Sequence, residues 1–129
     1  MKKLENFIRA LNNLGECFNY SEPFDAVTTT GLVGLYKICF DQAWKAMKEI
    51  LEQHGYDGSK TGSPRMVIKL AYGAGMIDDE ELWLDALSAR NNASHAYNEA
   101  IAISIINAAK NKFYDMFVRL KNEIEGSWL

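Results

Sequence analysis

Apolar side chains recur at steps of three and four residues near the start of the chain, and the positions between them are mostly polar. These steps bring side chains onto one face of an α-helix, because a helix turns once in about 3.6 residues. The pattern therefore predicts an amphipathic helix from Lys3 to about Phe18. Its buried face would consist of Leu4, Phe7, Ile8, Leu11 and Leu14.

A second helical pattern is strongest from Tyr36 to His54, where lysines and glutamates fall between the apolar positions. The apolar positions are Tyr36, Phe40, Ala43, Met47 and Ile50. Gly55 is placed to end this helix in the left-handed conformation. The preceding "TTTGLVG" has low helix propensity, so Gly31 and Gly34 indicate either a loose helix start or points of close packing. Asp25 is the expected N-cap.

Three further helix starts follow in the second half of the chain. Ser63 is an N-cap followed by proline at the first helical position, and this short helix should end at Gly75. Asp78 is the expected N-cap of the next helix, and Asn98 that of a last helix running toward Ile124. The stretch "YDGSKTG" is typical of a loop. Because no stretch alternates with a period of two, we expect an all-α, up-and-down bundle of about five helices, similar to a four-helix bundle.

The length and composition indicate one globular domain over residues 1–129. Hydrophobic residues make up 48% of the chain, but no apolar run reaches the roughly 20 residues that a membrane span needs. The N-terminal segment is amphipathic and unlike a signal peptide, so we expect a cytoplasmic protein that does not enter the membrane. A net charge of −3 argues against non-specific binding along nucleic acid. Any contact with RNA would be local.

No pattern for a metal or a cofactor is found. Cys17 and Cys39 lie at helical apolar positions without the spacing of metal ligands, so they are expected to be reduced and buried. The acidic run at 78–81 is explained by helix capping. A nucleotidyltransferase needs a D-x-D pair to hold Mg²⁺, and none follows the Gly-Ser dipeptide at 62–63. The chain is therefore not expected to be that enzyme itself.

A cluster of polar groups stands out at Arg90, Asn91, His95 and Tyr97. On an unbroken helix, side chains five positions apart point about 140° away from each other, so one helix could not present Arg90 and His95 together. Either the helix breaks near Ser94, or groups from two copies of the chain converge. A purely structural alternative is that Arg90 and Asn91 cap a helix end while His95 and Tyr97 are half-buried.

Several segments resemble one known family. The chain is similar to the nucleotidyltransferase substrate-binding proteins, a branch of the HEPN family, over about residues 25–124. The segments that carry this resemblance are "CFDQAWKAMKEILEQHG", "GSPRMVIKLAYGAGMIDDEELWLDAL" and "RNNASHAYNE". They contain the pattern Phe40-x-x-Ala43-Trp44-Lys45, the helix start Ser63-Pro64-Arg65, Trp83, and the full R-x4-H-x-Y spacing of Arg90, His95 and Tyr97.

The resemblance implies a HEPN-like helical bundle that forms a homodimer and is encoded beside a minimal nucleotidyltransferase. In one description of the family, the bundle is the substrate-binding or nucleotide-binding subunit of that two-component system, with binding residues Trp44, Lys45, Arg90 and Tyr97. In another, the pair is a toxin and antitoxin: the bundle is a metal-independent ribonuclease acting through Arg90, Asn91 and His95. The transferase then silences the bundle by adenylylating Tyr97. Both descriptions remain open at this stage, as does a bundle used only for assembly.

Overall fold

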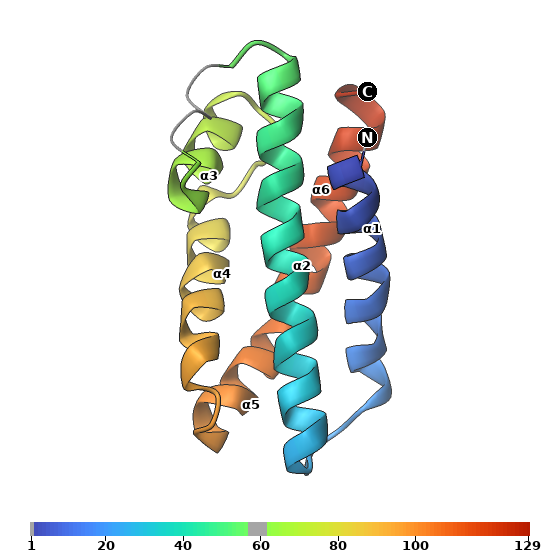
Figure 1. The fold of residues 1–129 in the computed structure, drawn as a ribbon, viewed down its shortest axis with the longest axis vertical. Coiled ribbons are helices and arrows are strands. Elements are labelled where there is room, and N and C mark those ends of the chain that lie inside the picture. Colours follow the sequence, from blue (N-terminus) through green and yellow to red (C-terminus); the bar gives the residue numbers. More distant parts are fainter. Residues whose placement is uncertain (1, 57–61) are drawn as a thin grey trace.

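A computed structural model describes residues 2–56 and 62–129 and consists of helices in this part of the chain. The α-helices are α1 (Lys2–Leu14), α2 (Ala26–Gln53), α3 (Pro64–Gly73), α4 (Glu80–Asn92), α5 (Glu99–Ala108) and α6 (Tyr114–Ser127). Figure 1 shows α2 as the long central helix, with α1 and α4 on either side of it. The chain runs down α1, up α2, down α4, and up α5 and α6, so both termini lie at one end. The expected all-α, up-and-down bundle is confirmed.

The first helix has the expected buried face but is shorter than predicted. It ends at Leu14, and a 3₁₀ turn follows at Gly15–Asn19. Phe7, Leu11 and Leu14 are buried, whereas Phe18 is exposed and packs edge-to-face on Tyr114. The apolar spacing of three and four continues past the true helix end, because a tighter 3₁₀ turn presents side chains at similar intervals.

The second helix starts ten residues before the strong apolar pattern, at Ala26. Asp25 is its N-cap, as predicted, and accepts a hydrogen bond from the Thr28 backbone N–H at 2.7 Å. Gly31 and Gly34 lie inside the helix, and a Cβ added at either would meet nothing within 4 Å. Within one chain, the close-packing interpretation of these two glycines is therefore wrong. The cap and the packing of Leu32 and Val33 into the core outweigh the low propensity of this stretch.

The third and fourth helices lie on the same side of α2 (Figure 1). Ser63 caps α3 as predicted, and Gly75 ends the turn after it with φ +82°. The predicted cap of α4 is wrong by one residue: Asp79, not Asp78, accepts the Leu82 N–H, at 3.0 Å. Asp78 is instead paired with Arg119 of α6 at 3.2 Å. The predicted loop at 56–62 lies mostly outside the described residues.

The last arm is one continuous helical rod with an irregular centre. Asn98 caps α5 by accepting the Ile101 N–H at 3.2 Å, as predicted. A π-helical turn at Ala109–Phe113 connects α5 to α6 without a break in the helical chain. Such turns add one residue per turn and shift the faces that the two halves of a rod present. Here Phe113, Phe117 and Ile124 all point into the core.

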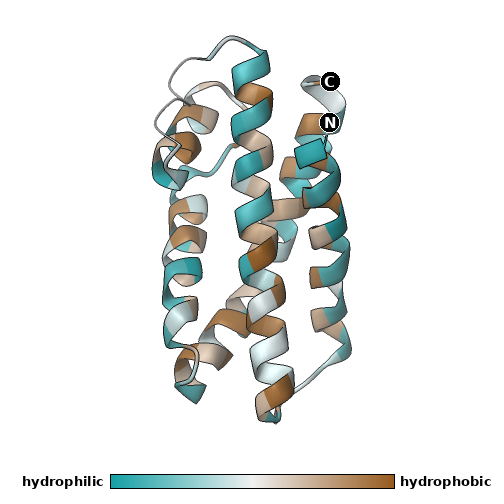
Figure 2. Cartoon of the chain, viewed as in Figure 1, coloured by the Kyte–Doolittle hydropathy of each residue, from teal (hydrophilic) through white to brown (hydrophobic). Residues whose placement is uncertain are grey.

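One cluster of buried apolar residues fills the centre of the bundle. Figure 2 shows hydrophobic positions recurring along each helix and nearly continuous in α5. The ring of Tyr36 contacts those of Phe113 and Phe117, and Trp83 packs edge-on against Phe117 at 5.6 Å between ring centroids. Cys17 and Cys39 are both buried and free of disulfides, as expected. Among the described helices, none is both long and apolar enough to cross a bilayer.

Candidate functional site

The helix carrying Arg90 and Asn91 ends at the polar cluster. α4 stops at Asn92, a 3₁₀ turn follows at Ala93–His95, and α5 begins at Glu99. Short-range hydrogen bonds hold this connection, from Ala96 N–H to the Ala93 carbonyl at 3.2 Å and from Asn98 N–H to the His95 carbonyl at 3.0 Å. The helix therefore breaks near Ser94, as the first of the two alternatives expected, but no described contact joins Arg90 to His95.

Arg90 is held by a carboxylate from another helix. Its Nε donates to Asp41 Oδ1 at 2.8 Å and its Nη2 donates to Asp41 Oδ2 at 3.2 Å. The side chains are 33% and 21% exposed, so the pair is partly shielded from water. The hydrogen bonds that Arg90 donates to Asp41 raise the pKa of Arg90, and the guanidinium stays charged. Paired forks of this kind fix the plane of the guanidinium as well as its position.

The fork leaves part of the guanidinium for other partners. An arginine side chain has five N–H donors. Two of them bind Asp41, and Nη1 donates a third to Asn91 Oδ1 at 3.3 Å. The described contacts thus use three donors, and two remain on Nη1 and Nη2. An anion could bind Arg90 through these atoms without breaking the ion pair with Asp41.

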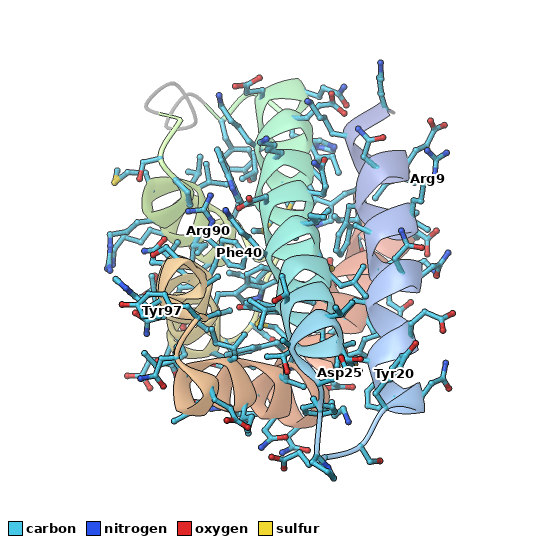
Figure 3. The ribbon with its side chains drawn as sticks, turned by 60° about the horizontal axis from the view of Figure 1, so that its bottom comes forward. Arg9, Tyr20, Asp25, Phe40, Arg90 and Tyr97 are labelled. Atoms are coloured by element: carbon cyan, nitrogen blue, oxygen red, sulfur yellow. The ribbon has the colours of Figure 1, made fainter. Side chains whose placement is uncertain are left out.

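His95 and Tyr97 form the second part of the cluster. Their rings meet edge-to-face with centroids 6.3 Å apart. His95 is exposed, and Tyr97 is 88% exposed. In Figure 3, Tyr97 lies on the outside of the bundle while Arg90 lies between α4 and α2. Half-burial, as the purely structural alternative required, is therefore wrong for both rings. The imidazole and the phenol are both accessible to a large ligand or another protein.

Comparisons with known proteins agree with this fold. A family model described as "Nucleotidyltransferase substrate binding protein like" matches residues 2–126. The chain belongs to this family. No curated protein matches the chain.

Two solved structures resemble this chain. A Thermus thermophilus protein is 28% identical, with a TM-score of 0.73, and the match covers 93% of this chain and 96% of that one. A Haemophilus influenzae protein is 19% identical, with a TM-score of 0.79, over 95% of this chain and 98% of that one. The latter is described as having the fold of a substrate binding domain of a nucleotidyltransferase. At that level of identity the likeness supports the helical-bundle fold.

The structure brings together some of the predicted site residues of this family member and not others. The described contacts join Arg90 to Asn91 and His95 to Tyr97, but none joins the two pairs. On α2, Lys45 is exposed and Trp44 is half-buried against the core. Helix geometry places both within about one turn of Asp41, although no described contact links them to Arg90.

Asp41 is the site residue that sequence reasoning missed. It lies 49 positions from Arg90, so no local spacing rule connects the two. One signal was present: Asp41 is the first acidic residue after the cap of α2, in a stretch that is otherwise apolar, small or hydroxylated apart from Lys37. Over the described residues, no group of three or more His, Cys, Asp or Glu side chains is arranged to hold a metal ion.

Proposed function

We propose that this chain is the substrate-binding and nucleotide-binding subunit of a separately encoded minimal nucleotidyltransferase, which works with it in the cytoplasm. One observation carries the proposal: a chain matching this family over residues 2–126 presents an accessible phenol, Tyr97, beside His95 at a helix break. The subunit binds the substrate and presents it to the transferase. A transferase encoded next to this chain is part of the same proposal.

The geometry supports binding of a nucleotide phosphate at this site. The two remaining donors of Arg90 suit phosphate oxygens, because guanidinium N–H groups bind oxyanions through short, charge-assisted hydrogen bonds. Lys45 adds a positive charge on the same helix as Asp41 and about one turn away. Trp44 contributes an aromatic surface beside it. Since Asp41 offsets the charge of Arg90, binding depends on the direction of the donors more than on net charge.

Binding and pairing can be tested together. The transferase should co-purify with the tagged chain. Titration with a nucleoside triphosphate should show that the nucleotide binds to the chain or to the complex. Arg90→Ala should weaken nucleotide binding about tenfold or more, as expected for loss of a charge-assisted contact. Arg119→Ala is the matched control, because Arg119 is also held by aspartates, Asp78 and Asp115, but on α6. Equal weakening by both variants would remove Arg90 from the site.

A second function, a metal-independent ribonuclease silenced by the transferase, is favoured by the exposure of His95. Cleavage without a metal needs a base for the ribose 2′-hydroxyl proton, an acid for the leaving 5′-oxygen, and a cation for the phosphorane. The 2′-oxygen bonds to phosphorus as the 5′-oxygen leaves with a proton. Histidine suits the proton transfers near neutral pH, and arginine suits the charge. Asn91 would help to orient the phosphate.

A homodimer completes this second proposal. One His95 per chain cannot be base and acid in the same instant, whereas a two-fold pair supplies two histidines and two arginines. In the silencing step, the Tyr97 hydroxyl oxygen bonds to the α-phosphorus of ATP and pyrophosphate leaves. The phenol proton passes to a base of the transferase. The added nucleotide then lies across His95, its ring neighbour. Such a pair would behave as toxin and antitoxin.

The ribonuclease proposal has its own test. Purified chain should cleave RNA in the presence of EDTA, and His95→Ala should abolish cleavage. His54→Ala is the control, because His54 is the other histidine of the chain and forms a hydrogen bond with the Trp128 carbonyl at 2.9 Å. Incubation with the transferase and ATP should label the wild type and not Tyr97→Phe. Equal cleavage by wild type and His95→Ala would overturn the catalytic role. Full activity of an Arg90→Ala, His95→Ala double variant would favour a bundle used only for assembly.

A further inference from the structure

A pocket adjoins Tyr97 between the start of α2 and the turn that leads into α5. Its volume is about 310 Å³, at the small end of the range for ligand pockets. Figure 3 places Asp25, the cap of α2, and Tyr97 at this end of the bundle. The lining residues are Phe24, Ala26, Thr29, Thr30, Ala96, Tyr97 and Glu99.

Two aromatic rings line this pocket, and one of them is contacted by a lysine that is not among the lining residues. Phe24 is half-buried against the core, and Lys110 Nζ lies 5.6 Å from its ring centroid. The same ammonium group donates a hydrogen bond to the Tyr20 carbonyl, which fixes the segment before Phe24. The second ring is Tyr97, with 88% of its surface exposed. A planar ligand can therefore pack on a fixed ring and bring Tyr97 against it.

The polar groups of the pocket favour a neutral ligand with N–H donors. None of the described lining residues is cationic, and Glu99 contributes a carboxylate. Thr29 Oγ1 already donates its proton to the Asp25 carbonyl at 2.9 Å, so it faces a ligand as an acceptor. A phosphate would be repelled by Glu99 at this position. The edge of a nucleobase, with amino or imino hydrogens, matches these acceptors.

We propose that this pocket is a nucleobase subsite, with Phe24 and Tyr97 as its stacking surfaces. The inference rests on the proposed nucleotide-binding function and adds to it the part of the nucleotide that is recognised here. Tyr97 belongs to both places: it lines the pocket and its ring contacts His95. A base stacked in the pocket leaves its ribose and phosphate on the His95 side of Tyr97. Stacking on aromatic side chains is tolerant of base identity, so several bases should bind.

The test compares a nucleotide with the same sugar phosphate lacking a base. Calorimetric titration of the full chain should show 5′-AMP binding at least tenfold more tightly than ribose 5-phosphate. Phe24→Ala should weaken AMP about tenfold and leave ribose 5-phosphate unchanged, since one stacked base contributes about this much. Tyr72→Ala is the matched control, because Tyr72 is a half-exposed ring on α3, at the opposite end of the bundle. It should bind both ligands as the wild type does.

A second variant distinguishes a loss of the pocket from a loss of the fold. Ala26→Leu places a larger side chain on an exposed lining position without removing a core contact, and it should also weaken AMP selectively. A short oligoribonucleotide, titrated in parallel, distinguishes a base within RNA from a free nucleotide. Tight AMP binding that neither variant changes would overturn the nucleobase subsite while the nucleotide-binding function stands. If the wild type and its transferase complex bind no nucleotide at all, the proposed function itself fails.

Discussion

Asp41 and Arg90 are 49 residues apart in the chain, yet their side chains form a bidentate ion pair between α2 and α4. The pair lies one helical turn beyond a second link between the same helices, the hydrogen bond from Tyr36 Oη to the Ala86 carbonyl at 2.6 Å. Both links hold α4 in a fixed rotation about its axis. Consequently the break after Asn92 presents His95 and Tyr97 on the outside of the bundle.

Replacing Asp41 separates the effect of this carboxylate on stability from its effect on anion binding. Asp41→Asn should lower the free energy of unfolding by about 1 kcal/mol, because the pair is only partly shielded from water. It should also strengthen binding of inorganic phosphate, since the charge of Arg90 is no longer offset. Urea denaturation and phosphate titration measure the two effects. Asp115→Asn is the control. It removes the ion pair between Asp115 and Arg119, whose side chains are 78% and 44% exposed, so the free energy of unfolding and the phosphate affinity should both stay unchanged within error.

The buried hydroxyl of Tyr36 offers a prediction about stability alone. Tyr36→Phe removes the hydrogen bond to the Ala86 carbonyl while keeping the ring contacts with Phe113 and Phe117. We expect a loss of about 1–2 kcal/mol in the free energy of unfolding, the usual contribution of a buried hydrogen bond. Tyr72→Phe on the exposed face of α3 should have no measurable effect. Equal denaturation midpoints for the wild type and Tyr36→Phe would contradict the assigned contact.

Glycine substitutions should act in opposite directions at two positions. Gly34→Ala should raise the free energy of unfolding by about 0.5–1 kcal/mol, because Gly34 is inside α2 and an added Cβ meets nothing within 4 Å. Gly75→Ala should lower it, because Gly75 has φ +82°, which L-residues rarely adopt. Thermal unfolding compares the three chains. Destabilisation by Gly34→Ala would indicate that a second copy packs against this face of α2.

The buried thiol of Cys39 predicts a loss of stability in alkaline solution. Desolvation raises the pKa of Cys39 above its ordinary value. The unfolded chain therefore releases this proton at a lower pH than the folded chain does. Stability is complete below an ordinary thiol pKa of about 8.5 and falls above it by at most about 1.4 kcal/mol per pH unit. Urea denaturation from pH 7 to pH 10 should show this fall, and Cys39→Ala should show a shallower one. Parallel curves for the two chains would argue against a raised pKa.

Much of the fold follows from local sequence signals. The apolar spacing of α1 and α2 identifies the buried faces, and the caps Asp25, Ser63 and Asn98 mark true helix starts. These predictions succeed because capping and helical periodicity involve residues only a few positions apart. The predicted cap of α4 is wrong by one residue because Asp78 and Asp79 have the same chemistry. Only the contact of Asp78 with Arg119 separates them.

The amino-acid sequence alone determined the helical character of the chain, its family resemblance and the cluster from Arg90 to Tyr97. It also restricted Arg90 and His95 to a broken helix or a pair of chains, since that conclusion needs only the pitch of a helix. The tertiary structure decided which carboxylate pairs with Arg90, that Tyr97 faces outward, and that Phe24 lines a pocket beside it. These features join segments that are distant in the chain, and their distances are set by how the whole bundle packs rather than by any local pattern.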